Sequence, residues 1–331
     1  MKVVEKDPKG SSSSGSKNTG HKAKNAAQTA GQLSTEPHKT PKGVRQEIIK
    51  KFPVRCNLED YETTYNTFSW EDAKREISYF AGGKVNAAYN AVDRHLVNGR
   101  KNKVALYSVD PKGDLTKFTF LEIYEAANRL GNALKSIGIK KGDRVFVFLP
   151  RVAELYIATI AIAKIGAIAG PLFSAFGPDA LRDRLQDSEA KVVITNPALK
   201  DKIDGIKKEL PDLEHIIVVD ATEKDLKNGE LCYNSLVANQ STELKCEPMD
   251  PEDPLYLLYT SGTTGKPKGV VHVHNDILGQ HMTTKWVLDL KDDDIYWCTA
   301  DPGWVTGTVY GIFGPWSNGA SCVSYEGRFD A

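Results

Sequence analysis

The sequence predicts an α/β fold with layered, mostly parallel sheets flanked by helices. Between residues 144 and 219, short runs rich in Val, Ile and Phe alternate with longer helical patterns. This alternation is the spacing of parallel strands joined by crossover helices. The first run, Val-Phe-Val-Phe-Leu within residues 144–149, is apolar without alternation, as expected of a strand buried on both faces.

The elements can be assigned in order from residue 104. A strand at 104–108 and a turn at 110–113 come first. Thr119 and Glu122 then form a capping box for a helix whose apolar residues recur at helical spacing up to Ile137, and Gly138 ends it. The strands predicted next are 144–149, 169–173, 191–195 and 215–219, and the helices are 153–168, 178–185 and 197–209.

The remaining chain repeats this pattern less regularly. Residues 220–253 are polar and end in Asp-Pro-Glu-Asp-Pro, a stiff lead-in to a strand at 255–259. Later we expect strands at 270–273, 294–299 and 321–325, and a helix that Asn275 or Asp276 caps and that ends near residue 288. Ligands of open α/β sheets lie at strand ends, which predicts that Thr260 and Asp301 are neighbours.

The most informative stretch is Tyr-Thr-Ser-Gly-Thr-Thr-Gly-Lys-Pro-Lys-Gly at residues 259–269. Its glycines permit positive φ and close approach, so that successive N–H groups can face one concavity. Hydroxyls and lysines add donors that suit a polyphosphate, at about 1.5 to 3 kcal/mol for each charge-assisted hydrogen bond. Lys268 is the favoured cation, since one of two lysines so close together can point to solvent. The candidate phosphate ligands are Thr260, Ser261, Gly262, Thr263, Thr264, Gly265, Lys266 and Lys268.

Two other interpretations of this loop are weaker. A Walker A loop continues from its lysine into Ser or Thr and a helix, whereas Lys266 is followed by Pro267 and then by Val-Val-His-Val-His. A plain hairpin turn needs only about two to five residues and has no use for two lysines. The sequence therefore predicts strand, phosphate loop, strand.

These residues carry a family resemblance. Tyr-Thr-Ser-Gly-Thr-Thr-Gly-Lys-Pro-Lys-Gly resembles the signature phosphate loop of AMP-forming acyl-CoA synthetases and related adenylating enzymes. Asp-Pro-Gly-Trp-Val-Thr-Gly and its continuation to residue 318 are similar to the acetyl-CoA synthetase branch, as are residues 61–95. The resemblance covers roughly residues 58–329. It implies a truncated large N-terminal domain of an adenylate-forming enzyme: residues 46–100 a helical segment, 101–331 an incomplete AMP-binding domain, and the C-terminal domain with its catalytic lysine absent.

The resemblance also implies the chemistry. Acetate or another short carboxylate attacks the α-phosphate of ATP and releases pyrophosphate, and the thiol of coenzyme A then displaces AMP to give a thioester. ATP, coenzyme A and Mg²⁺ are the implied cofactors, with Mg²⁺ bridging phosphate oxygens rather than held in a protein metal site. Thr264 and Lys268 are the expected catalytic residues, and Trp304, Val305 and Thr306 the wall of the acyl and coenzyme A pocket. The chain alone is expected to be inactive.

Two stretches depart from the family pattern and put the coenzyme A contacts in question. Phe-Ser-Ala-Phe at residues 173–176 stands where one acetyl-CoA synthetase subgroup has paired glycines. Only Lys200 and Lys202 follow Thr195, where a basic cluster is expected. Two alternative functions stay open: an adenylating enzyme with another acceptor, and a non-catalytic nucleotide-binding fragment. An incomplete sheet also predicts a tendency to aggregate.

Three residue roles have competing interpretations. Trp304 can line the pocket or pack in the core after the Asp-Pro-Gly turn. Asp301 can cap that turn or reach the site. His272 and His274 lie two residues apart, but without a third ligand nearby they are expected to be structural rather than a metal pair.

Composition limits the remaining possibilities. The chain has 43 basic and 43 acidic residues, so its charge gives no indication of nucleic-acid binding. Residues 1–45 hold nine Lys or Arg and three acidic residues and almost no large apolar groups, which predicts a disordered basic tail, a solvated spacer rather than a site for an anionic partner. That tail matches neither a secretory signal nor a transit peptide. Its role and the oligomeric state stay open.

The membrane and the oxidising compartments are not indicated. The apolar run at 153–173 is interrupted by Lys164 and closed by glycines and Pro171, which predicts a buried helix rather than a span. Five scattered cysteines without a Cys-x-x-Cys pair indicate core thiols in a reducing compartment. We therefore expect a cytoplasmic protein whose partners are a small carboxylate, ATP and coenzyme A, with no nucleic acid and no membrane.

Overall fold

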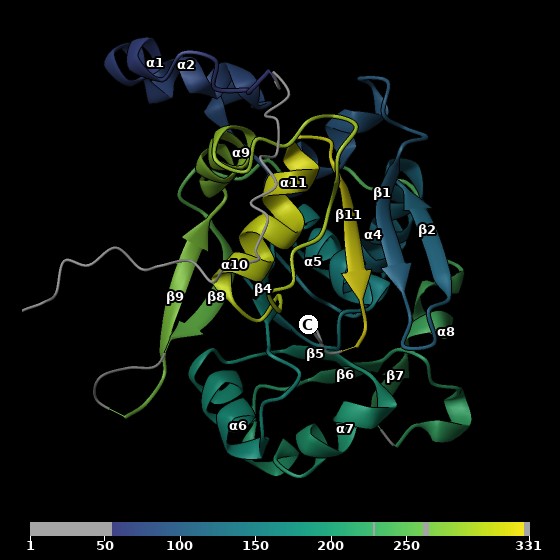
Figure 1. The fold of residues 1–331 in the computed structure, drawn as a ribbon. Helices are drawn as coiled ribbons and strands as arrows, with labels where there is room; N and C mark the ends of the chain where they lie inside the picture. Colours follow the sequence, from purple (N-terminus) through teal and green to yellow (C-terminus); the bar gives the residue numbers. More distant parts are fainter. Residues whose placement is uncertain (1–54, 228, 261–264, 328–331) are drawn as a thin grey trace, which may run out of the picture. The chain divides into compact units, whose positions relative to one another are not determined.

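A computed structural model describes residues 55–227, 229–260 and 265–327. The tail predicted at residues 1–45 lies outside the described residues. Within them, the strands form two separate sheets (Figure 1), one of seven strands and one of four. This arrangement confirms the predicted α/β class.

The larger sheet carries the predicted strand and helix alternation. Its order is β7-β6-β5-β3-β4-β8-β9, and every neighbouring pair is parallel except β8 with β9. The crossover helices connect these strands in the order the sequence predicts. The bounds are β3 (Arg144–Phe148), β4 (Ile168–Pro171), β5 (Val192–Thr195), β6 (His215–Val218), β7 (Glu230–Cys232), β8 (Pro254–Thr260) and β9 (Lys268–Val273).

The smaller sheet pairs strands from early and late parts of the described chain. Its order is β10-β11-β1-β2, and β1 pairs with β11 in parallel, with Leu106 opposite Cys322. Strand β2 returns antiparallel along β1. The bounds are β1 (Val104–Val109), β2 (Leu115–Thr119), β10 (Ile295–Tyr296) and β11 (Ser321–Tyr325).

Most helices lie where the sequence predicts. The Thr119 hydroxyl accepts a hydrogen bond from Glu122 N, and the Glu122 carboxylate accepts one from Thr119 N, which confirms the capping box. The bounds are α1 (Tyr61–Thr67), α2 (Trp70–Ala73), α3 (Ala87–Ala91), α4 (Phe120–Ser136), α5 (Ala153–Lys164), α6 (Pro178–Asp187), α7 (Pro197–Asp204), α8 (Tyr233–Ala238), α9 (Asp276–Trp286), α10 (Val305–Thr308) and α11 (Gly314–Ser317). Short 3₁₀ turns lie at Lys74–Glu76, Ala81–Gly83, Asp93–Leu96, Lys207–Glu209 and Glu223–Asp225, and a π-helical turn at Val309–Phe313 joins α10 to α11.

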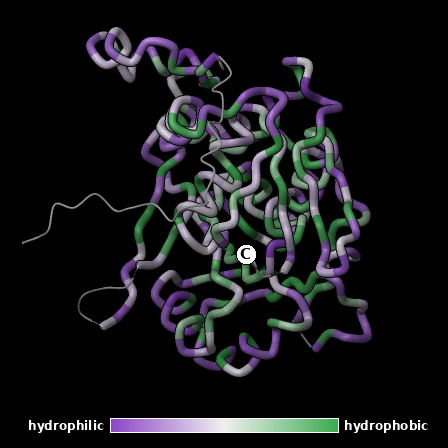
Figure 2. The backbone as a smooth tube through the Cα atoms, viewed as in Figure 1, coloured by the Kyte–Doolittle hydropathy of each residue, from purple (hydrophilic) through white to green (hydrophobic). Residues whose placement is uncertain are grey.

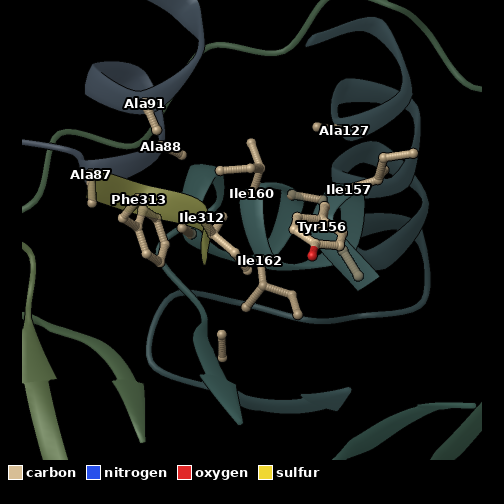
Figure 3. Packing of buried hydrophobic residues seen from close by; sticks show 14 of the residues in the cluster. Ala87, Ala88, Ala91, Ala127, Tyr156, Ile157, Ile160, Ile162, Ile312 and Phe313 are labelled. Carbon is tan, nitrogen blue, oxygen red and sulfur yellow. The ribbon is translucent and has the colours of Figure 1, made fainter. Parts of the chain in front are cut away.

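Helix α5 forms the centre of the main core. All its residues are buried except Glu154, so it is apolar on every side. Its isoleucines and Tyr156 pack with the alanines of α3, with Ala127 of α4 and with Phe313 (Figure 3). Figure 2 shows hydrophobic stretches along β8 and β9, and mainly hydrophilic ones along α6 and α7.

Lys164 ends α5 as a fully buried charge. Its Nζ lies 2.6 Å from Asp93 Oδ1 and 4.3 Å from the centre of the Tyr124 ring. The lysine that interrupts the apolar run is therefore paired inside the core, as the buried-helix prediction requires. Among the residues that the structure describes, no helix is long and apolar enough to cross a membrane.

The structure corrects several expected elements. Strand β2 was not predicted, and residues 220–253 contain β7 and α8 where only a polar stretch was expected. Residues 305–317 are helical. The strand expected at 294–299 is limited to β10, and α5 and α7 end four and five residues before their expected ends. Cys232, Cys246 and Cys322 are buried as expected, whereas Cys56 is exposed.

Candidate functional site

The predicted phosphate loop closes a β-hairpin. Thr260 stands opposite Lys268 in the antiparallel register of β8 and β9, and the loop between them leads into a strand rather than a helix. This confirms the strand, loop, strand prediction. Thr260, Gly265, Lys266 and Lys268 are exposed, and Gly265 has a φ of 98°, which favours glycine.

Four predicted phosphate ligands, Ser261, Gly262, Thr263 and Thr264, lie outside the described residues. Their roles therefore stay predictions. The structure does place the two strands that carry them, so that hydroxyl and amino groups flank the loop on both sides.

The strand that leads into the loop is tied to α6. The Tyr259 hydroxyl donates to Asp187 Oδ2 at 2.7 Å, and the Arg184 guanidinium lies 5.6 Å from the Tyr259 ring. Burial raises the pKa of Tyr259, which keeps this hydroxyl a donor. The same guanidinium lies 4.2 Å from the Phe176 ring. Arg184 thus connects the loop strand to the segment at residues 173–176.

A cavity of about 820 Å³ lies at the carboxyl ends of β3, β4, β5 and β11, where ligands of α/β sheets bind. Its walls combine aromatic and small apolar groups with a few polar ones. The lining residues are Pro150, Arg151, Phe173, Ser174, Ala175, Asn196, Ala198, Leu199, Thr299, Asp301, Trp304, Glu326 and Gly327. Thr260 is not among them, so its predicted proximity to Asp301 stays a prediction.

Trp304 forms one wall of this cavity. It is 50% exposed, which contradicts the interpretation that it packs in the core. Its ring lies 6.1 Å from that of Phe173, and Phe173 in turn meets Phe176 edge to face at 5.7 Å. Val305 and Thr306 are exposed at the start of α10 but are not among the residues that line the cavity.

Two glycines let the Trp304 loop approach its neighbours. A Cβ on Gly303 would lie 2.3 Å from Phe173 N, and a Cβ on Gly307 would lie 2.1 Å from Asp301 O. Neither position has room for a side chain, because the neighbouring atoms belong to the backbone. The backbone of Phe173, just after β4, therefore lies directly against Gly303 and determines the position of the neighbouring Trp304.

Asp301 fulfils both roles that the sequence left open. Its Oδ1 accepts a hydrogen bond of 2.8 Å from Gly303 N, which caps the turn, and the residue also lines the cavity. Burial raises the pKa of this carboxyl group. Thr308 closes the same loop, since its hydroxyl donates to Pro302 O at 2.6 Å.

The two lysines of the weak basic cluster are engaged within the protein. Lys200 is buried and lies 3.0 Å from Glu230 Oε1. Lys202 donates to Phe176 O at 3.0 Å and to Ser174 O at 3.3 Å, so it holds the segment at 173–176 in place. This contact could not be predicted from local patterns, because it joins residues 26 and 28 positions apart.

Arg151 is the cavity residue that the sequence interpretation missed. It donates to Thr299 O at 2.9 Å and to Gly327 O at 2.6 Å, and it faces the same cavity as Asp301 and Glu326. Its position just after β3 is the signal that could have found it, because residues that follow parallel strands line the ligand edge.

The two histidines that follow the loop make their contacts within the protein. His274 is fully buried and its Nδ1 accepts a hydrogen bond of 3.1 Å from Ala87 N. His272 stacks on Tyr256 and lies 2.9 Å from Asp276 Oδ2. In the described ranges, no group of three or more His, Cys, Asp or Glu side chains is placed to hold a metal ion.

Comparison with known proteins agrees with this geometry. A family model described as AMP-binding enzyme matches residues 93–330. The acetyl-coenzyme A synthetase of Bacillus subtilis is 54% identical over 82% of this chain and 47% of its own length. The acetyl-coenzyme A synthetase of Methanothrix thermoacetophila is 46% identical over 76% of this chain and 40% of its own length.

A solved structure shares the fold. The crystal structure of Brucella canis acyl-CoA synthetase superposes with a TM-score of 0.76 and 32% identity, over 82% of this chain and 48% of that chain. The present chain thus spans about half the length of the relatives it matches. The matched region holds both the β8 and β9 hairpin and the Trp304 cavity, and by this match the chain belongs to the AMP-binding enzyme family.

Proposed function

We propose that this chain is the N-terminal part of an AMP-forming ligase that joins acetate, or another short carboxylate, to coenzyme A. The observation that carries the proposal is the phosphate-loop hairpin, in a chain whose curated relatives are named acetyl-coenzyme A synthetase. In this reaction the carboxylate oxygen attacks the α-phosphorus of ATP and pyrophosphate leaves. The thiolate of coenzyme A then attacks the acyl carbon, and AMP leaves with the bonding electrons.

The residues of the hairpin would position the polyphosphate. Lys268 supplies a charge that suits the β and γ oxygens, and the hydroxyls of Thr260, Ser261, Thr263 and Thr264 supply donors. Gly262 and Gly265 would let the backbone approach the phosphates, with Lys266 as a second cation. Phosphoryl chemistry of this kind depends on position and charge, which this loop offers without a nucleophile of its own.

Mg²⁺ fits this proposal as an ion that binds to the phosphates of the nucleotide rather than to a protein metal site. The described residues offer no cluster of His, Cys, Asp and Glu to cage a metal, whereas the hairpin offers hydroxyl groups beside the expected phosphates. Mg²⁺ prefers oxygen ligands and usually binds through phosphates and water. When bound, it would neutralise the charge of the polyphosphate.

The cavity beside Trp304 would receive the acyl group and the thiol. Its aromatic wall of Trp304 and Phe173 suits a small apolar group, and Val305 and Thr306 follow directly on α10. An enzyme with another acceptor is the alternative within the family. The similarity of residues 301–318 to the acetyl-CoA synthetase branch favours coenzyme A.

A chimera tests the proposal directly. In it, this chain replaces the matching stretch of Bacillus subtilis acetyl-coenzyme A synthetase, and pyrophosphate release is measured with acetate, ATP and coenzyme A. We expect release that requires acetate, and a loss of about tenfold or more in Lys268→Gln, the value of one charge-assisted contact. The variant Lys208→Gln, an exposed lysine on a distant 3₁₀ turn, is the matched control.

Two outcomes would contradict the proposal. A folded chimera that releases no pyrophosphate would exclude the ligase function. Equal activity of Lys268→Gln and the control would exclude the assignment of Lys268 to the phosphates.

A further inference from the structure

A second cavity lies away from the strand ends, between residues 57–100 and α9. Its volume is about 570 Å³, and most of the residues that line it are polar or charged. The lining residues are Asn57, Glu76, Ser78, Tyr89, Arg94, His95, Val97, Asn98, Arg100, His281, Lys285, Leu290, Lys291, Asp292, Ser317 and Asn318. None of them belongs to the proposed phosphate loop or to the Trp304 cavity.

The walls carry an excess of positive charge. Four cations face two carboxylates, and three of the cations have partners: Lys285 lies 2.8 Å from Glu76, Arg100 2.6 Å from Asp292, and Lys291 2.6 Å from Asp289 beside the cavity. The fourth cation is Arg94.

Arg94 has no carboxylate partner within the part of the chain that the structure describes. Its guanidinium donates to three neutral oxygens, Glu76 O at 2.8 Å, Asn90 Oδ1 at 3.5 Å and Ser317 O, while its buried Nε–H finds no acceptor among the described residues. Burial and the nearby Arg100 lower the pKa of Arg94 to about 10, so it stays charged at neutral pH. Arg94 is half-buried, and a half-buried cation without a carboxylate contact is stabilised when an anion joins it.

His281 Nε2 is a second buried polar atom without a hydrogen-bond partner among the described residues. It is only 4% exposed, and its Nδ1 lies 3.1 Å from the Ser317 hydroxyl. That hydroxyl donates to Gly314 O at 2.7 Å, so it must accept from His281 Nδ1–H. Nε2 is then the bare nitrogen of a neutral ring, and Glu76 Oε2 lies 3.7 Å away, beyond hydrogen-bond reach.

We propose that this cavity binds a small tetrahedral oxyanion of the sulfate and phosphate type, held by Arg94 and Arg100, with His281 Nε2 as the third contact. A planar guanidinium presents paired N–H groups that match such an anion. The anion would give the Arg94 Nε–H its missing acceptor and would balance the excess charge of the walls.

The third contact requires a proton. Sulfate offers no hydrogen, so it can meet Nε2 only when His281 is protonated. The charged groups that face this ring are Glu76, Arg94 and Lys285, and burial together with the two cations opposes protonation while Glu76 favours it. A bound dianion also favours protonation of His281, so sulfate would bind together with a proton.

Isothermal titration of the 331-residue chain with sodium sulfate, at constant ionic strength, tests the proposal. We expect one saturable site, weakened about tenfold or more in Arg100→Gln and in Arg94→Lys. Arg182→Gln is the matched control, since its side chain is 29% exposed against 30% for Arg100 and it too pairs with a carboxylate. Lys268→Gln removes a proposed phosphate contact, so it separates sulfate bound at the phosphate loop from sulfate bound in this cavity. The control Arg182→Gln should bind as the unchanged chain does.

The proton linkage gives a second readout. Sulfate affinity should fall as pH rises from about 6 to about 8, by at most about tenfold per unit, and this dependence should disappear in His281→Asn. Inorganic phosphate and glycerol phosphate, titrated in parallel, distinguish a free anion from a phosphate monoester. Absence of saturable sulfate binding, or equal affinity in Arg100→Gln and Arg182→Gln, would overturn the site, and a pH-independent affinity would overturn the His281 contact.

Discussion

Buried neutral histidines should make this protein sensitive to mild acid. His274 holds the start of α3 by accepting from Ala87 N, and His95 Nε2 lies 2.6 Å from Trp316 O. Burial lowers the pKa of each ring to about 3, against an ordinary value near 6.5. In the pH range where a histidine of the unfolded chain begins to bind a proton, each of these rings is therefore still uncharged in the folded protein.

The size of the effect follows from this difference. Between the two pKa values only the unfolded state binds the proton, so the stability present above pH 6.5 is lost as pH falls toward 3. For one such histidine, the free energy of unfolding should fall by about 2 kcal/mol between about pH 7 and about pH 5.

The variant His274→Asn isolates this contribution. Asparagine can present an acceptor near the place of Nδ1, but it does not titrate. Urea unfolding, followed by tryptophan fluorescence at both pH values, should show that the original chain loses about 2 kcal/mol more than the variant. Carboxylates titrate in both proteins, so their contributions to the pH dependence of stability cancel when the two losses are compared. An equal loss in the two proteins would refute the argument, since it would mean that His274 accepts a proton in the folded state.

Two further perturbations test the packing of the site and of the core. Gly303→Ala should cost about 1 to 3 kcal/mol and shift the fluorescence of Trp304, because the new Cβ meets the backbone of Phe173; an unchanged melting curve would contradict this close approach. Asp93→Asn should cost about 3 to 5 kcal/mol in urea unfolding, because it leaves the Lys164 ammonium buried without its counter-ion. Adding Lys164→Met should recover most of that loss, and a failure to recover would show that the pair is not the cause.

Local patterns predicted the fold best where the relevant contacts are also local. The capping box of Thr119 and Glu122 and the strands β3 to β6 follow from spacing over a few residues. Strand β7 was missed because its first residue is Glu230, a charged residue that is buried in contact with Lys200, 30 positions away. Such a partner cannot be read from local hydropathy.

The helical segment at 305–317 was missed for a related reason. Gly307, Gly311, Gly314 and Pro315 indicate a loop by composition. In the structure these glycines allow close packing instead: a Cβ on Gly314 would lie 2.2 Å from Thr284 Oγ1. Tertiary contact overrides a weak local preference here.

The candidate site shows the same division. The hairpin around the phosphate loop follows from its own sequence, since β8 and β9 are adjacent in the chain. The Trp304 cavity does not, because Arg151, Asn196 and Trp304 line it from three distant segments. Their residue types were visible in the sequence, but their convergence depends on the sheet.

The parallel pairing of β1 with β11 bears on the order in which the molecule assembles. Ser321, 217 positions after Val104, donates its hydroxyl to Val104 O at 2.6 Å. Contacts between α4, β3 and α5 close short loops and can form early on the ribosome, whereas β1 must wait until β11, which begins 217 positions later, has emerged. Until then one edge of β1 has unpaired backbone N–H and C=O groups that can pair with another chain. A chaperone that shields this edge during synthesis would raise the yield of folded protein.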